Sequence, residues 1–144
     1  MTIRKATPAD SAVLGQLAAC MWEHNTEELT SEFHVLTASR EAACFLAFDG
    51  DNAVGFAQCQ LRHDYVEGCE TSPVGFLEGI YVAEGFRLTG TGRALLTACE
   101  SWAISMGCSE FASDCELDNA VSHAWHMKNG FTEMGRTIWF AKKL

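Results

Sequence analysis

The most constraining feature of the sequence is the stretch of residues 76–96, FLEGIYVAEGFRLTGTGRALL, in which an apolar run, a glycine-rich turn and an amphipathic segment follow one another directly. Residues 76–82 have the aromatic and β-branched content of a buried strand. From Leu95 to Met106, apolar residues recur at the spacing of one helical face, so a helix is predicted to begin near Gly92. The stretch is therefore predicted to form a strand, a tight turn and a helix in succession.

The turn itself, residues 87–92 (RLTGTG), has the character of a phosphate-binding loop. Glycines allow a backbone to turn tightly and to approach a ligand without interference from Cβ atoms. The free N–H groups and the positive dipole end of the following helix would face a ligand in the turn. A P-loop and a dinucleotide fingerprint are both excluded, because no Gly-Lys-Ser/Thr follows and the Gly-x-Gly-x-x-Gly spacing is not matched. A diphosphate group is the predicted ligand, and a plain structural loop is the alternative.

The length and charge of the chain limit the classes of protein to which it can belong. Its 144 residues suit one domain, so a single domain over residues 1–144 is predicted. No apolar run approaches the roughly 18 residues that span a bilayer, and the N-terminus lacks the apolar core of a secretion signal. A cytoplasmic protein is therefore expected. The net charge of -9 disfavours nucleic acid and membrane surfaces as partners and favours a cationic substrate.

The cysteines and histidines give no pattern of a metal site or a disulfide framework. The seven cysteines are an odd number and include no Cys-x-x-Cys pair, and the five histidines include no His-x-x-x-His pair. Most of the cysteines lie within apolar runs, where they are expected to pack as small core residues. No metal is predicted, and a cysteine-rich redox protein is disfavoured for the same reason.

The remaining segments predict a single mixed sheet of the α+β class, flanked by about four helices. Residues 49–52 (DGDN) predict a hairpin turn between two strands, and residues 23–39 predict a shorter second helix or an ordered loop. Asp118 is expected to cap the last helix, which Gly130 should end. The expected strands are residues 2–5, 42–48, 53–62, 76–82, 110–115, 131–136 and 137–142.

The spacing Arg87-x-x-Gly90-x-Gly92 after an apolar strand resembles the acyl-CoA signature Q/R-x-x-G-x-G/A of the GNAT N-acetyltransferases. The order of the predicted elements is also that of the GNAT fold over essentially the whole chain. Residues 62–74 (RHDYVEGCETSPV) and 76–80 (FLEGI) are similar to the aminoglycoside 6'-N-acetyltransferases within that family. Further resemblance to these enzymes lies in Ala112-Ser-Asp114 and in His126-x-x-x-Gly-Phe131.

This resemblance implies that acetyl is transferred from acetyl-CoA to the 6'-amine of an aminoglycoside antibiotic, by direct attack within a ternary complex. It also implies a role in antibiotic resistance and a homodimer. A GNAT enzyme for another polyamine or a protein amine is one alternative, and an acyl-CoA-binding domain without turnover is another. The carboxylates of Glu78 and Asp114 speak against the second, because a pure cofactor binder needs none beside a thioester.

The resemblance further implies which residues contact the cofactor. The main chain of the central strand should hold the pantetheine arm and provide an N–H for the oxyanion. Asn119 matches a position near the pantetheine arm, although a simple helix-start residue is equally compatible. The expected cofactor contacts are Ile80, Tyr81, Val82, Arg87, Leu88, Thr89, Gly90, Thr91, Gly92, Arg93 and Asn119.

A polyamine with many hydroxyls requires carboxylates for its ammonium groups and aromatic surfaces for its sugar faces. Glu78 stands within an apolar strand, where burial of a carboxylate is unfavourable unless it has a partner or a hydrated pocket. It is therefore the first catalytic candidate, and a structural salt bridge is the alternative role for it. Asp114 could equally receive the proton. His126 could protonate the leaving thiolate or be an ordinary helix residue. The expected substrate contacts are Trp22, His24, Tyr65, Glu70, Glu78 and Asp114.

Overall fold

The apolar and alternating runs form one mixed sheet in the computed structural model, which describes all of residues 1–144. Its strands are β1 (Thr2–Lys5), β2 (Ala42–Asp49), β3 (Asn52–Arg62), β4 (Val74–Val82) and β5 (Phe111–Ser113). They lie in chain order across the sheet, and all neighbours are antiparallel except β4 and β5, which are parallel. This confirms the α+β class and the predicted hairpin between β2 and β3.

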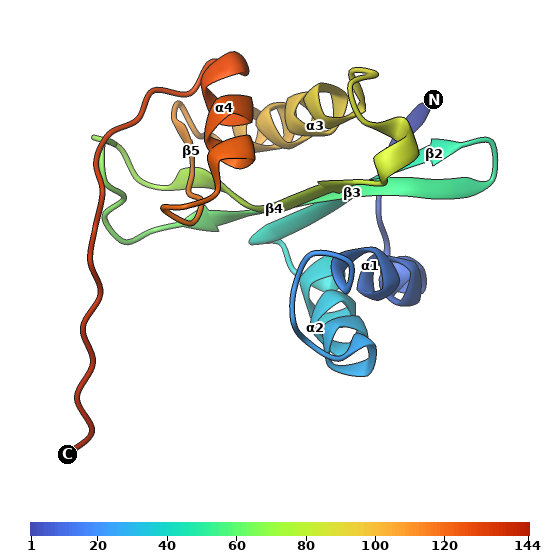
Figure 1. Ribbon diagram of the computed structural model, residues 1–144, viewed down its shortest axis with the longest axis horizontal. Coiled ribbons are helices and arrows are strands. Elements are labelled where there is room, and N and C mark those ends of the chain that lie inside the picture. Colours follow the sequence, from blue (N-terminus) through green and yellow to red (C-terminus); the bar gives the residue numbers. More distant parts are fainter.

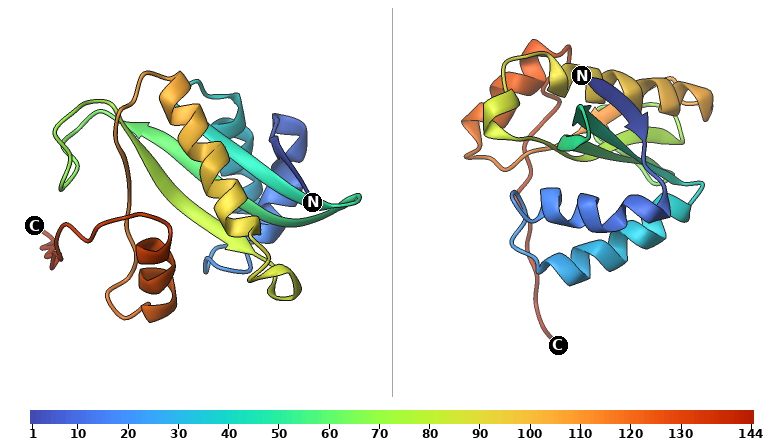
Figure 2. Two further views of the ribbon diagram at one scale, coloured as in Figure 1. Left: turned by 90° about the horizontal axis from the view of Figure 1, so that it is seen from above. Right: turned by 90° about the vertical axis from the view of Figure 1, so that its right-hand side faces the viewer.

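Helices cover both faces of the sheet. They are α1 (Ser11–Ala18), α2 (Thr26–Ala38), α3 (Thr91–Ser105) and α4 (Ala120–Lys128), with 3-10 turns at η1 (Pro8–Asp10) and η2 (Glu84–Phe86). The helices α1 and α2 lie together on one side, and α3 and α4 lie on the other (Figure 1, Figure 2). None of the helices is long and apolar enough to cross a membrane.

Local side-chain chemistry sets the ends of these helices. Asn25 begins α2 by accepting a hydrogen bond from the Glu28 N–H at 2.9 Å. The last helix is capped by Asn119, one residue after the predicted Asp118, because the Asn119 side chain accepts from the Ser122 N–H at 3.0 Å. Gly130 follows this helix with a φ of 94°, as expected of a glycine that ends a helix.

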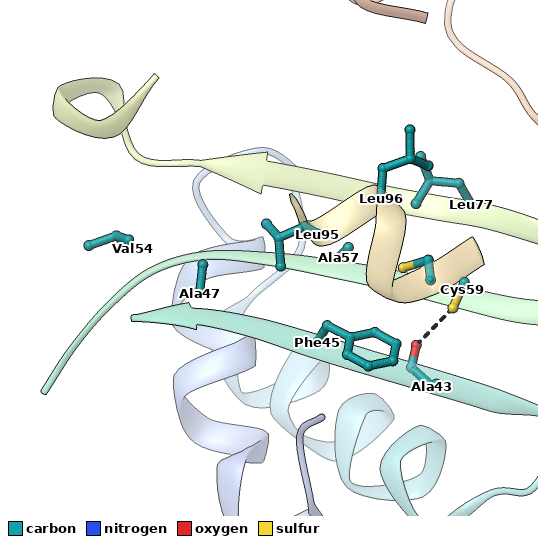
Figure 3. Close-up of a cluster of buried hydrophobic side chains, with 10 residues drawn as sticks. Ala43, Phe45, Ala47, Val54, Ala57, Cys59, Leu77, Leu95 and Leu96 are labelled. Atoms are coloured by element: carbon teal, nitrogen blue, oxygen red, sulfur yellow. Dashed lines mark hydrogen bonds between the residues drawn. The ribbon is translucent and has the colours of Figure 1, made fainter. Parts of the chain in front are cut away.

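The core is divided into two clusters by the sheet. On one face, Leu95 and Cys99 of α3 pack against the sheet side chains drawn in Figure 3. On the other, Leu14 and Phe33 of the first two helices pack against Phe56. The strands between them are buried on both faces, which explains their nearly continuous apolar sequences.

Three of the seven cysteines are fully buried in this core, as predicted for small apolar residues. The Cys59 thiol donates to the Ala43 carbonyl at 3.5 Å (Figure 3). Burial raises the pKa of the Cys44 thiol to about 12. Cys99 belongs to α3 and packs with Cys59 on one face of the sheet, whereas Cys44 packs on the other face, and all seven cysteines are unpaired thiols.

The strands β4 and β5 separate after three residue pairs, of which the last is Leu77 with Ser113. Beyond that pair β4 runs on to Val82 and stays paired with β3 on its other side. The edge of β4 that faces away from β3 is therefore free from Glu78 onward, and backbone N–H groups of an unpaired edge are available to a ligand.

The two final strands predicted for residues 131–136 and 137–142 are not formed, so this part of the prediction is wrong. Residues 129–144 contain no helix or strand, and the chain runs away from the body as an extended arm (Figure 1, Figure 2). Ile138, Trp139 and Phe140 are exposed by 80, 88 and 92%. The apolar β-branched and aromatic content is that of a strand, but a strand forms only where a sheet edge accepts its backbone groups.

Candidate active site

The glycine-rich turn joins η2 to α3 and is held by its own polar groups. The Arg87 Nε donates to the Val82 carbonyl at 2.8 Å, which ties the turn to the end of β4. The hydroxyls of Thr89 and Thr91 lie 2.9 Å apart, and the Thr89 hydroxyl also donates to the Phe86 carbonyl. These bonds fix the loop that precedes the first turn of α3.

Gly90 occupies the N-cap of α3 with a φ of 85°, in the left-handed region that side chains disfavour. A Cβ at this position would have no atom within 4 Å, so the space beside the turn is open. The first N–H groups of a helix lack intrahelical partners and attract anions. Arg93 lies in the same first turn. These residues fit a diphosphate such as that of CoA.

Replacement of Gly90 by valine is expected to weaken acetyl-CoA binding by about tenfold, because a β-branched residue disfavours the left-handed backbone by roughly 1–2 kcal/mol. Titration calorimetry with CoA measures this Kd. The same strain should lower the melting temperature, but by less than the loss of a core side chain would, since the new side chain meets no neighbour. An unchanged Kd for CoA would show that this turn does not contribute to cofactor binding.

Glu78 lies at the point where β4 leaves β5, and a bidentate ion pair holds its carboxylate. Arg62, the last residue of β3, donates to Glu78 through Nε at 3.0 Å and through Nη2 at 2.9 and 3.0 Å. The guanidinium also lies over the Phe76 ring, with 3.5 Å from Cζ to the ring centroid. Arg62 is thus fixed from two sides and orients the carboxylate.

The environment of Glu78 raises the pKa of its carboxyl in spite of the ion pair with Arg62. Burial raises the pKa of the Glu78 carboxyl above its ordinary value, the Arg62 hydrogen bonds and charge lower it, and the negative charge of Asp114 raises it. The side chain of Glu78 is 19% exposed, so it still reaches solvent. A carboxylate with a raised pKa in a half-open position suits proton transfer near neutral pH.

Asp114 directly follows β5, one position beyond the last pair between Leu77 and Ser113. Glu78 is one position beyond the same pair on β4, and the two charges are near enough to affect one another. The structure therefore brings together the two predicted catalytic carboxylates at the gap between the strands.

A pocket of about 240 Å³ opens beside Glu78 on the side of α1 and α2. Trp22 forms one wall, and its indole lies over Gly79, where a Cβ would be only 2.5 Å from the ring. The indole also meets the Phe56 ring edge-on at 5.9 Å. The residues that line the pocket are Trp22, His24, Leu29, Glu32, Gln58 and Glu78.

Both nitrogens of His126 are bound within the protein. Nδ1 donates to the Ser122 carbonyl at 2.7 Å, and Nε2 lies 2.7 Å from the Ser113 hydroxyl. The ring packs against Trp125 and Phe131. His126 therefore links α4 to β5, and any proton from its ring would pass through Ser113. Asn119 caps α4 through its side-chain oxygen, and its amide N–H2 group makes no hydrogen bond within the protein.

Tyr65 and Glu70 lie on the loop between β3 and β4, outside the residues that line the pocket. Tyr65 is exposed and donates to Glu67 at 3.3 Å. The carboxylate of Glu110 holds the far part of this loop by accepting from the N–H groups of Glu70 and Thr71 at 2.9 and 2.8 Å. The loop is thus ordered, with the Tyr65 ring turned to solvent.

Five residues of the site were not identified from the sequence: Leu29, Glu32 and Gln58 of the pocket, Arg62, and Ser113, which is bonded to His126. Gln58 is a polar residue in the apolar run of β3, which is a signal of the same kind as that of Glu78. Glu32 is one of several acids on α2, and nothing in the sequence distinguishes it. No group of three or more His, Cys, Asp or Glu side chains is arranged to hold a metal ion.

Comparison with known proteins identifies the class of this site. The model of the acetyltransferase (GNAT) family matches residues 13–131. The aminoglycoside N(6')-acetyltransferase type 1 of Stenotrophomonas maltophilia is 46% identical over 99% of this chain and 94% of its own length. The enzyme of that name from Acinetobacter haemolyticus is 39% identical over 100% of this chain and 99% of its own length.

Solved structures agree with these relatives. The apo aminoglycoside 6'-N-acetyltransferase of Acinetobacter haemolyticus superposes with a TM-score of 0.94 at 39% identity and covers 100% of this chain and 99% of its own. AAC(6')-Iy in complex with the bisubstrate analogue CoA-S-monomethyl-acetylneamine gives a TM-score of 0.94 at 34% identity, over 99% of this chain and 98% of its own. The chain therefore belongs to the GNAT acetyltransferase family, among the aminoglycoside N(6')-acetyltransferases.

Proposed function

We propose that this enzyme transfers acetyl from acetyl-CoA to the 6'-amine of aminoglycosides and so confers resistance to them. The observation that carries the proposal is the position of Glu78, a half-buried carboxylate with a raised pKa at the gap between β4 and β5. The relatives that match over the full chain carry this activity in their names, and AAC(6')-Iy was solved with an analogue that joins CoA to acetylneamine.

In the proposed reaction, the 6'-amine attacks the thioester carbonyl directly, so that a C–N bond forms and the C–S bond breaks. Glu78 accepts the amine proton through water, and Asp114 holds the ammonium form of the acceptor nearby. A backbone N–H on the free edge of β4, among residues 80–82, stabilises the oxyanion. We propose that the Ser113 hydroxyl, which lies 2.7 Å from His126 Nε2, passes a proton to the CoA thiolate and regains one from solvent water, so that CoA leaves as the free thiol.

The cofactor is proposed to bind along the free edge of β4 with its pyrophosphate at the start of α3. The support is the left-handed Gly90, the unpaired N–H groups of the first helical turn and the cations Arg87 and Arg93. Asn119 caps α4 through its side-chain oxygen, which leaves its amide N–H2 group to contact the pantetheine arm.

The deciding experiment is CoA release from acetyl-CoA with three acceptors: a 6'-amino aminoglycoside, its 6'-hydroxyl analogue and spermidine. We expect release with the 6'-amine alone, since only that acceptor places a nucleophile where the thioester lies. Release with spermidine alone would favour another polyamine as substrate. Tight acetyl-CoA binding without release from any acceptor would favour an acyl-CoA-binding domain.

We propose a homodimer in which the arm of residues 137–144 pairs with the second copy. The support is the exposure of Ile138, Trp139 and Phe140 on a segment with strand composition, since apolar patches of this kind mark contact surfaces. The outer edge of β5 has no strand partner within the chain. An unpaired sheet edge and an unpaired extended arm are complementary in a two-fold arrangement.

We propose that the enzyme acts in the cytoplasm, where acetyl-CoA is available. The seven unpaired cysteines support this location, because a reducing compartment keeps thiols free.

A further inference from the structure

The pocket beside Glu78 contains more polar groups than the transfer of one proton requires. Glu32 comes from α2, Gln58 from β3 and Glu78 from β4, and Trp22 closes one side. These residues are far apart in sequence, so the fold has assembled carboxylates, an amide and an aromatic wall at one place.

Gln58 is the most unusual of these side chains. It is only 9% exposed, and its amide makes no hydrogen bond to any other residue. No fully buried side-chain nitrogen or oxygen lacks a partner, so the remaining exposure of Gln58 lies at its amide, where the pocket opens. An amide that reaches only this opening and has no partner in the protein requires water or a ligand to complete its hydrogen bonds.

Glu32 supplies the uncompensated charge of the pocket. The carboxylate of Glu78 is already paired with Arg62 through three contacts of 2.9–3.0 Å. Glu32 is in no ion pair and lies in the middle of α2, facing the pocket over Leu29. A cation that enters the pocket can therefore pair with the carboxylate of Glu32.

The wall formed by Trp22 is fixed in position. Its indole lies over Gly79 and packs edge-on against Phe56, and Gly79 is the register partner of Gln58. The amide of Gln58 and the indole of Trp22 thus border the same floor, where position 79 has no side chain. An apolar ring beside polar groups suits a sugar-like ring with both hydroxyl and ammonium substituents.

We propose that this pocket is a subsite for a second ammonium group of the acceptor, which Glu32 binds while the Gln58 amide bonds a neighbouring hydroxyl. The reacting amine then lies at the half-buried Glu78, and the second cation lies toward the outer rim of the pocket, where Glu32 is exposed. This inference rests on the proposed acetyl transfer and adds to it a requirement for a second positive charge on the substrate. It makes Glu32 and Gln58 determinants of specificity rather than catalytic residues.

The test compares two acceptors with the same reacting group. Neamine has the 6'-amine together with further ammonium groups, whereas 6-amino-6-deoxyglucose has the equivalent amine alone. In Glu32→Gln, kcat/KM for neamine is expected to fall about tenfold through KM, the change for one lost charge-assisted contact. For 6-amino-6-deoxyglucose, kcat/KM should stay within twofold of wild type. Gln58→Met, of similar volume, should raise KM for neamine several-fold with kcat near wild type.

Glu27→Gln is the matched control, because it removes the same charge from α2 on another side of the helix. An equal loss of kcat/KM for neamine in Glu27→Gln would mean that the general negative charge of α2, and not a subsite at Glu32, attracts the substrate. This result would overturn the inference. So would equal losses for both acceptors, or an unchanged KM in both Glu32→Gln and Gln58→Met. Wild-type silence on both acceptors would overturn the proposed acetyl transfer itself, and melting temperatures within a few degrees of wild type confirm that the variants are folded.

Discussion

Replacement of Glu78 by glutamine is expected to lower kcat about hundredfold or more, because general base catalysis contributes factors of this size. The Kd of acetyl-CoA should stay within twofold, since Glu78 lies away from the turn that begins α3. Steady-state CoA release and titration calorimetry measure the two quantities. Equal losses in kcat and in cofactor affinity would mean that Glu78 supports the whole site instead of the chemical step.

The pH dependence of kcat/KM for the same reaction tests independently whether Glu78 is the base. Glu78 accepts a proton only when ionised, so kcat/KM should fall as pH drops through its raised pKa. Arg62→Gln removes the contacts that lower this pKa, so the acid limb should move to higher pH. Asp114→Asn removes a charge that raises this pKa, and the limb should move to lower pH. The other titratable groups that face the pocket are His24 and Glu32.

These opposite shifts distinguish a positioning role for Arg62 from a merely structural one. A loss of packing would reduce activity at every pH without moving the limb. Shifts of both variants in one direction, or no shift in either, would remove Glu78 from the role of base and leave Asp114 as the candidate.

Deletion of residues 137–144 is expected to convert the proposed dimer into a monomer. Burial of each large apolar side chain contributes about 1.5–3 kcal/mol, so the loss of Ile138, Trp139 and Phe140 should weaken association by at least roughly a thousandfold. Light scattering after size-exclusion chromatography measures the mass over a range of concentrations. The deletion leaves the contacts of Glu133 with His123 at 2.9 Å and with Arg136 at 3.1 Å.

A second variant keeps the length of the arm. Trp139→Lys with Phe140→Lys should also give a monomer, because the charges oppose burial of the arm. A wild-type chain that is monomeric at all concentrations would contradict the arm-mediated dimer, as would a deletion variant that remains dimeric.

The sequence predicts best where local chemistry determines the backbone. The strand, turn and helix of residues 76–96 could be read directly, because apolar spacing and glycines act over neighbouring residues. The hairpin at residues 49–52 could be read for the same reason. Residues 137–142 illustrate the limit: their composition is that of a strand, but no strand forms there, because strand formation depends on a free sheet edge, which composition does not encode.

The same limit applies to the site. Glu78 could be selected because a carboxylate in an apolar strand needs an explanation, but its pairing with Arg62 depends on the register between β3 and β4. The sequence is compatible with either a functional role or a structural salt bridge for Glu78, and the structure contains the ion pair at a position suited to proton transfer. Glu32 could not be selected, since only the packing of α2 against the sheet turns one of its acids into the pocket.

Gly79 has a consequence for how this enzyme could evolve. The indole of Trp22 lies where a side chain at position 79 would be, since even a Cβ there would come within 2.5 Å of the ring. Any glycine codon becomes an alanine codon by a change of one base, and the added methyl would force the ring outward and reshape the acceptor pocket. A single-nucleotide change at this codon could thus alter the range of antibiotics that a descendant of this gene inactivates.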